Sequence, residues 1–255
     1  MNTLITGASS GIGAALAEAC AAPGETLFIC GRNAARLDAV AAACRARGAT
    51  CHAQVLDVTD LDATRAWLDA CERLAPLERV FANAGVGTGE ENEENVRKTF
   101  ATNVGGTLNV VLPAIEIFRR HKARDKRAHA QILITASIAG YGPLATCPAY
   151  SATKSCLKTW ALALRGMLRP EGIRVSAICP GFVRSRITER NTCPMPFFME
   201  APRAARIILA RAKRNVGLIA FPWPMRFATW CLSILPYPLN EAMNRLLPPK
   251  RRRQP

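Results

Sequence analysis

The segment "NTLITGASSGIGAALAEAC", residues 2–20, places a glycine-rich loop between an apolar strand and a helix of small residues. Glycines let the backbone turn tightly and approach a ligand closely. The helix that follows offers free N–H groups and the positive end of its dipole. A glycine-rich loop alone also marks ordinary turns, but here the strand and the helix that the motif requires are both present. The segment therefore predicts a site for the pyrophosphate of a dinucleotide.

The alternation of strand and helix continues along the chain. Near-continuous apolar strands that alternate with helices indicate a parallel sheet covered on both faces. We predict an α/β fold, a single doubly wound Rossmann-type domain over residues 1–221, with a lid at about 185–200 and a C-terminal extension at 222–255. Further strands are expected at 26–32, 50–58, 77–85, 130–137, 173–181 and 217–221, and helices at 33–48, 61–74, 92–120, 151–168 and 202–214.

The stretch "PAYSATKSC", residues 148–156, puts Tyr150 and Lys154 four residues apart on one face of a predicted helix. A tyrosine has a reference pKa near ~10, and a neighbouring ammonium group lowers this value by favouring the phenolate. Ser137 lies upstream at the end of a strand, where its hydroxyl can hold the oxygen of a substrate. A Tyr–Lys pair by itself is also compatible with ordinary packing.

The glycine spacing, combined with Ser137, Tyr150 and Lys154, resembles the short-chain dehydrogenase/reductase family from about Asn2 to Phe221. The resemblance implies a catalytic set in which Tyr150 is the acid/base, Lys154 tunes it, Ser137 holds the substrate oxygen and Asn103 organises a relay water. It also implies a dinucleotide site made by Gly7, Ser9, Gly11, Ile12, Gly13, Arg32, Asp57, Val58, Asn83, Ala84, Gly85, Tyr150, Lys154, Pro180, Gly181, Val183 and Ser185.

Two positions depart from the family pattern, and one position bears on the choice of cofactor. Ala82 stands where the family usually has a second Asn, and Ser185 stands where it usually has Thr. Cofactors without a 2′-phosphate are usually held by an acid at the position of Gly31, whereas Arg32 would pair with a phosphate. We therefore expect NADP(H) to be preferred. NAD(H) stays open, because the glycine loop has no second basic residue.

Apolar side chains in the expected lid, Met195 and Phe197–Met199, suggest a lipophilic substrate, or only packing of the lid. The extension 222–255 is broken by prolines. Its longest charge-free run, 227–240, is shorter than the ~20 apolar residues of a membrane span. We expect this extension to pack on the domain or on a partner. Peripheral contact with an anionic membrane through Lys250–Arg253 is the alternative.

The chain carries a net charge of +15, and residues 201–255 hold eleven Lys or Arg against the single acid Glu241. Such a balance favours anionic partners, but no nucleic-acid-binding motif accompanies it. Ten cysteines without a CxxC pair indicate reduced thiols, and no secretory signal is expected, so we predict a cytoplasmic, or membrane-peripheral, location. His52, His121 and His129 have no metal-ligand spacing, and no metal is expected. Arg184, Arg186 and Arg190 could meet an acidic substrate or simply face solvent.

We therefore predict an NADP(H)-dependent oxidoreductase of the carbonyl reductase or alcohol dehydrogenase type, acting on a lipophilic carbonyl or alcohol. The alternative is an NADP(H)-sensing regulatory or membrane-peripheral protein that uses the same fold. Retention of Ser137, Tyr150 and Lys154 favours the enzyme, because a sensor does not need them. By the family's habit we expect a homodimer or homotetramer that associates through helices 92–120 and 151–168.

Overall fold

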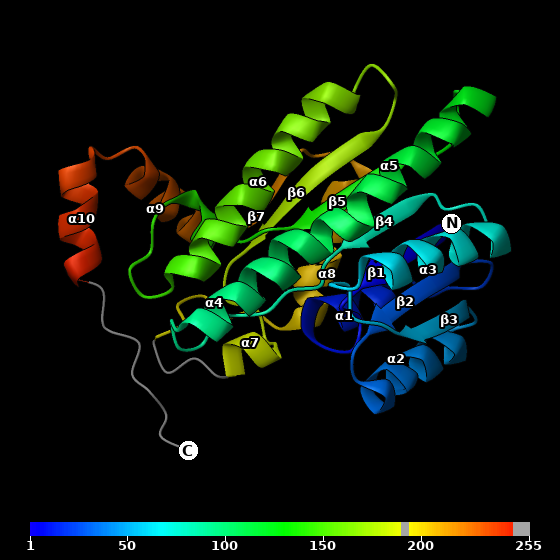
Figure 1. Ribbon diagram of the computed structural model, residues 1–255, viewed down its shortest axis with the longest axis horizontal. Helices are drawn as coiled ribbons and strands as arrows, with labels where there is room; N and C mark the ends of the chain where they lie inside the picture. Colours follow the sequence, from blue (N-terminus) through cyan, green and yellow to red (C-terminus); the bar gives the residue numbers. More distant parts are fainter. Residues whose placement is uncertain (190–193, 247–255) are drawn as a thin grey trace.

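The computed structural model describes residues 1–189 and 194–246. Within them the strands form one parallel sheet in the order β3-β2-β1-β4-β5-β6-β7 (Figure 1). The predicted α/β fold, a doubly wound Rossmann-type domain, is confirmed. The strands are β1 (Asn2–Thr6), β2 (Thr26–Gly31), β3 (Thr50–Val55), β4 (Arg79–Ala82), β5 (Gln131–Thr135), β6 (Arg174–Pro180) and β7 (Leu218–Phe221).

Helices cover both faces of this sheet, so the inner strands are apolar on both sides, whereas the edge strand β3 is largely exposed. Successive residues of a strand point to opposite faces. Accordingly, Leu4 of β1 packs in one buried cluster with Phe118, and the next residue, Ile5, packs in the other cluster with Leu16. The first cluster contains residues of α3 (Leu61–Leu74), α5 (Gly106–Arg124) and α6 (Pro148–Leu168). The second contains residues of α1 (Gly11–Cys20), α2 (Ala34–Ala46) and α8 (Ala201–Lys213).

The helix expected at 92–120 consists of three segments. It begins as α4 (Glu93–Phe100), widens into a π-helical turn, η1 (Ala101–Gly105), and continues as α5 to Arg124. Wide turns of this kind recur at functional sites. Here the turn contains Asn103, which is fully buried and hydrogen-bonded to the backbone of another segment. The hydrophobic pattern alone gives no sign of the wide turn, because it runs on through both α-helical parts.

The described part of the C-terminal extension forms two helices, α9 (Trp223–Ser233) and α10 (Tyr237–Leu246). The prolines that break its apolar run stand at helix starts, where a missing N–H costs nothing: Pro222 and Pro224 at α9, Pro236 and Pro238 at α10. Helix α9 contacts β7 and a short 3₁₀ helix, η2 (Ile138–Tyr141). Lys250–Arg253 lie outside the described residues. No helix among those described is both long and apolar enough to cross a membrane.

Every cysteine in the described part of the chain is a free thiol, and most are buried in the two clusters. Such cysteines behave as small apolar side chains. Burial raises the pKa of Cys30, Cys71 and Cys179 to about 12 in each case, which keeps these thiols protonated. Cys193 lies outside the described residues.

We expect Gly140→Ala to destabilise the fold, because η2 lies directly against the backbone of α6. A Cβ at Gly140 would lie 2.5 Å from the carbonyl carbon of Lys154 and 2.6 Å from its oxygen. Overpacking against backbone costs about 1–3 kcal/mol, which for a chain of this size lowers Tm by about 2–4 °C per kcal/mol. Thermal denaturation followed by circular dichroism measures the change.

Gly166→Ala in α6 is the matched control. No atom lies within 4 Å of its added Cβ, so the better helix propensity of alanine should stabilise the protein by up to about 1 kcal/mol. Equal Tm values for the two variants would contradict the packing argument.

Candidate active site

A cavity of about 620 Å³ opens at the carboxyl edge of the sheet, where the chain order reverses between β1 and β4. Ligands of doubly wound folds bind at this position. Most residues expected at the dinucleotide and catalytic sites line the cavity, but Gly13 and Asn103 do not. The lining includes Gly7, Ser9, Gly11, Ile12, Arg32, Asp57, Val58, Asn83, Ala84, Gly85, Ser137, Tyr150, Lys154, Pro180, Gly181, Val183 and Ser185.

The glycine loop fits a pyrophosphate group. Gly7 and Gly11 have φ values of +67° and +58°, which side chains other than glycine rarely adopt. Gly13 stands behind the loop, where a Cβ would collide with the carbonyl oxygen of Gly7. The loop can therefore lie close to the start of α1, where Gly11 and Ile12 line the cavity and free helix N–H groups favour an anion. Gly13 shapes the site without lining it.

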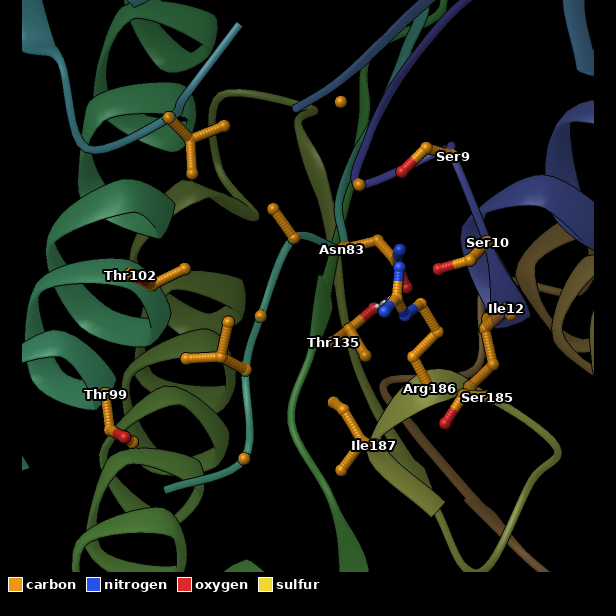
Figure 2. A pocket seen from close by; sticks show the side chains of 18 of the residues that line it. Ser9, Ser10, Ile12, Asn83, Thr99, Thr102, Thr135, Ser185, Arg186 and Ile187 are labelled. Carbon is orange, nitrogen blue, oxygen red and sulfur yellow. Dashed lines mark hydrogen bonds between the residues drawn. The ribbon is translucent and has the colours of Figure 1, made fainter. Parts of the chain in front are cut away.

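Asn83 joins three neighbouring strands at the floor of the cavity (Figure 2). Its Nδ2 donates to the carbonyl oxygen of Thr6 at 3.1 Å, and its Oδ1 accepts from the Thr135 hydroxyl at 3.2 Å. The Thr6 hydroxyl oxygen accepts from the backbone N–H groups of Asn83 and Ala84. These bonds satisfy polar groups at the ends of β1, β4 and β5 and fix the positions of the loops that follow.

Ser137 and Tyr150 meet at the inner end of the cavity. Both side chains line it. Ser137, 7% exposed, begins η2, where its hydroxyl accepts from the N–H of Ala139 at 3.1 Å and donates to the carbonyl oxygen of Pro180 at 3.4 Å. Burial of the phenol raises the pKa of Tyr150 to about 12, and hydrogen bonding with the Ser137 hydroxyl opposes this rise. The pKa of Tyr150 is thus raised and not lowered as expected, because desolvation of the phenolate is the largest effect.

Lys154 is buried beside the tyrosine, with its Nζ 5.7 Å from the centre of the Tyr150 ring. The Nζ donates to the carbonyl oxygen of Thr135 at 2.9 Å. Burial lowers the pKa of Lys154 to about 8. Lys154 therefore loses its charge at a lower pH than the one at which Tyr150 titrates, so its ammonium does little to favour the phenolate here.

Asn103 forms hydrogen bonds both to the loop after β4 and to helix α6. Its Oδ1 accepts from the N–H of Val86 at 2.8 Å, and its Nδ2 donates to the Val86 carbonyl at 3.0 Å and to the Thr153 hydroxyl at 3.1 Å. The side chain is thereby committed to protein partners. This arrangement fixes the Asn103 side chain, and the relay role that the resemblance implies stays a prediction.

Arg32 and Asp57 face each other across the far end of the cavity, with Nη1 and Oδ2 3.5 Å apart. Partial burial raises the pKa of Asp57, but the two hydrogen bonds from Thr59 and the charge of Arg32 outweigh this and lower it overall. Arg36 also lines the cavity. A Cβ at Gly31 would lie 3.0 Å from Ser9, so a larger side chain there would crowd the glycine loop.

The three lid arginines have different environments. Arg184 is paired with Glu200 at 2.9 Å, which removes it from the cavity. Arg186 extends from α7 (Arg186–Glu189) into the cavity (Figure 2), in the same segment as Ser185, which lies against Gly11. Arg190 lies outside the described residues.

The apolar lid residues do not line the cavity. Met199 is buried against the domain, where its backbone bonds to Phe182 and Arg184, whereas Phe197 and Phe198 are exposed. Met195 is partly exposed, and the lid residues 190–193 lie outside the described part. Ile187 and Thr188 of α7 contribute to the cavity wall instead.

The histidines have structural neighbours. His52 stacks on Phe28, His121 pairs with Glu72 at 2.6 Å, and His129 lies 3.0 Å from the carbonyl oxygen of Glu78. Across the described residues, no group of three His, Cys, Asp or Glu side chains could hold a metal ion.

Sequence reasoning missed a contact at the start of the catalytic helix. Helix α6 begins after Cys147, whose side chain makes no capping bond. Instead, Glu91 from the loop after β4 accepts from the N–H of Ala149 at 2.5 Å. A carboxylate at this position satisfies a free N–H and interacts with the helix dipole. No local pattern indicates the contact, because its partners are 58 residues apart.

A model of the family described as short chain dehydrogenase matches residues 1–194. An uncharacterised oxidoreductase of Myxococcus xanthus is 40% identical over 253 residues, which cover 96% of each chain. A short-chain dehydrogenase from Sphingobium yanoikuyae, solved in complex with NADPH, superimposes with a TM-score of 0.78 at 26% identity, covering 100% of this chain and 98% of that one.

A short-chain dehydrogenase from Mycobacterium paratuberculosis, bound to NAD, has the same fold, with a TM-score of 0.72 at 23% identity over 86% of this chain and 94% of that one. The two solved relatives thus hold different nicotinamide cofactors, and their likeness alone does not choose between them.

We expect Glu91→Ala to lower the free energy of unfolding by about 1 kcal/mol, the usual cost of losing a helix cap, while Glu91→Gln, which keeps an acceptor, loses less. Hydrogen exchange of the first turn of α6 should accelerate in Glu91→Ala. The measurements are chemical denaturation and exchange followed by mass spectrometry. Glu94→Gln, an exposed change in the adjoining α4, is the control. Unchanged exchange at residues 149–154 in Glu91→Ala would show that the contact does not hold the helix.

Proposed function

This chain belongs to the short-chain dehydrogenase/reductase family, and we propose that it is an NADP(H)-dependent enzyme that interconverts a lipophilic ketone or aldehyde and its alcohol. NAD(P)-dependent oxidoreductase activity is the family's property; the cofactor preference, substrate class and residue roles are our proposal. The observation that carries it is that Ser137, Tyr150 and Lys154 line one cavity together with the glycine loop, with the Lys154 Nζ 5.7 Å from the centre of the Tyr150 ring.

The proposed reaction assigns each side chain one task. The nicotinamide cofactor supplies or accepts the hydride. The Ser137 hydroxyl binds the carbonyl oxygen and orients it toward Tyr150, and the Tyr150 hydroxyl donates its proton to this oxygen as it gains charge. A phenol with a pKa of about 12 is fully protonated at neutral pH, which suits a proton donor for reduction. Positive charge from Lys154 or from an oxidised nicotinamide would favour the phenolate that the reverse reaction needs.

Arg32 is the residue we propose for the 2′-phosphate. Arg32 directly follows β2, and both Arg32 and Arg36 line the cavity. Planar N–H donors of arginine match a phosphate group. The absence of an acid at Gly31, and the crowding that a side chain there would cause at Ser9, support the same preference. Asp57 and Val58 are the proposed adenine contacts, and Pro180–Ser185 the proposed nicotinamide contacts.

We propose that the protein works in the cytoplasm as a homodimer or homotetramer, which is the family's habit. Support comes from exposed apolar side chains on the two long helical segments, among them Phe100, Leu112, Leu162 and Met167. We propose residues 1–221 as the catalytic domain. Residues 222–255 form an extension, of which α9 and α10 are described.

We expect Tyr150→Phe to abolish turnover while NADPH binding stays within about twofold of wild type, because the ring is kept and only the acidic hydroxyl is removed. Loss of general acid catalysis costs about 10²–10⁴-fold in kcat. The measurement is NADPH oxidation with a panel of aliphatic, aromatic and polycyclic carbonyls, beside NADPH titration by fluorescence. Tight NADPH binding without turnover of any carbonyl by the wild type would favour the sensing alternative.

We expect Arg32→Leu to raise KM for NADPH by about 10- to 100-fold, the worth of a charge-assisted hydrogen bond. KM for NADH should change less than about twofold, because NADH has no 2′-phosphate to lose a partner. Steady-state kinetics with both cofactors measure the change. Arg47→Leu, which breaks an exposed pair with Glu18, is the control. An equal rise for both cofactors would remove Arg32 from the 2′-phosphate site.

A further inference from the structure

Helix α9 is apolar on two opposite faces. Met225 packs on the core, and its Sδ lies 3.1 Å from where a Cβ at Gly181 would be. The opposite face is an exposed stripe at helical spacing i, i+4, i+7 and i+11. Its members, the α9 stripe, are exposed by 75%, 58%, 49% and 62%: Trp223, Phe227, Trp230 and Ile234.

The α9 stripe is not a scatter of single apolar residues. The rings of Phe227 and Trp230 lie 6.1 Å apart, so the aromatic surface is continuous along the helix. Contiguous exposed apolar surface marks an interaction site, whereas isolated exposed residues need no explanation. Figure 1 shows α9 and α10 at one end of the molecule, and the four side chains of the stripe are exposed in the single chain.

The charge around the stripe is positive. Helix α9 contains no acid, and Arg226 is exposed on it. From Trp223 to the end of the sequence there are six Lys or Arg and one acid, Glu241, a balance of +5. Four of these basic residues, Lys250–Arg253, fall in the nine residues after Leu246, so the chain that follows α10 can add charge but almost no apolar surface.

We propose that the α9 stripe docks on the surface of an anionic bilayer. Tryptophan and phenylalanine are suited to the boundary between headgroups and acyl chains, and nearby Arg and Lys bind anionic headgroups. A helix of eleven residues is about 16 Å long, roughly half the thickness of the hydrocarbon core, so it lies in the plane of the interface.

The same charge argues against a second copy of the chain as the occupant. A two-fold interface brings the same patch of both subunits together. A two-fold interface on the stripe would bring the exposed Arg226 of α9 close to its symmetry copy, and like charges that face each other are unfavourable. A negatively charged surface pairs with Arg226 instead.

Docking through α9 would bring the catalytic site close to the bilayer. The helix contacts η2, which Ser137 begins, and Met225 lies against Gly181 of the cavity wall. A lipophilic carbonyl could thus pass from the bilayer to the site without crossing much water. This consequence for the substrate rests on the proposed function; the docking itself does not.

The test is sedimentation of the full chain with vesicles, either of phosphatidylcholine alone or of an equimolar mixture with phosphatidylglycerol. We expect binding to the anionic vesicles, weakened about tenfold or more without the anionic lipid and at high salt. The double variant Phe227→Ser/Trp230→Ser should lose about tenfold or more in binding. The variant Leu61→Ser/Leu74→Ser, which removes two exposed apolar side chains from α3, should bind as wild type does.

A second readout locates the contact. Trp67 and Trp160 lie in the domain core and at its margin, and Trp223 and Trp230 lie in the stripe. Quenching of tryptophan emission by brominated lipid should therefore occur in the wild type. It should fall in the variant Trp223→Phe/Trp230→Phe, even if this variant still binds the vesicles. An unchanged thermal transition and NADPH affinity would show that every variant is folded.

Three outcomes would overturn the proposal. They are the absence of binding to anionic vesicles, equal binding by the wild type and the Phe227→Ser/Trp230→Ser variant, and a shift of the lipid-free oligomer to smaller mass in that variant. The last outcome would assign the stripe to a second copy. Vesicle binding needs no turnover, so a failed carbonyl panel would count against the proposed function alone.

Discussion

The hydrogen bonds of Asn83 set the geometry on which the rest of the site depends. Its side chain bonds to Thr6 before the glycine loop and to Thr135 before the Ser137 turn, and the Thr135 carbonyl in turn accepts from Lys154. One amide side chain therefore links the glycine loop to Lys154 through fixed backbone. Buried polar networks of this kind hold a single arrangement when every member is satisfied, and here the network crosses from β1 to β5.

Helix α6 is the second rigid part of the site, and it is held at several points. Glu91 binds its first turn, Asn103 reaches Thr153, and the backbone beside Lys154 lies against Gly140. Both Glu91 and Asn103 belong to the region between β4 and the end of the π-turn. This region therefore holds α6, which carries Tyr150 and Lys154, although neither Glu91 nor Asn103 lines the cavity. A catalytic pair gains from such support because small displacements of reacting groups are costly.

Much of the fold could be predicted from the sequence, because apolar strands covered on both faces and a glycine loop between strand and helix are local patterns. Tyr150 and Lys154 could be found for the same reason, being four residues apart. The π-turn at Asn103 and the contact of Glu91 with Ala149 could not, since they depend on pairs far apart in the chain. The raised pKa of Tyr150 was missed because desolvation is a property of the packed structure, whereas the proximity of Lys154 is visible in the spacing.

Arg32 forms an ion pair with Asp57, and a cofactor phosphate that binds Arg32 would compete with this pair. Arg32 already has an anion 3.5 Å away, so a 2′-phosphate at the proposed site would compete with a carboxylate for it, while Asp57 also has its two bonds from Thr59. The proposed preference would then equal the difference between the attraction of Arg32 to the phosphate and its attraction to Asp57. Arg32 and Asp57 are partly exposed, so salt screens these attractions, and ionic strength becomes one of the variables that set the preference.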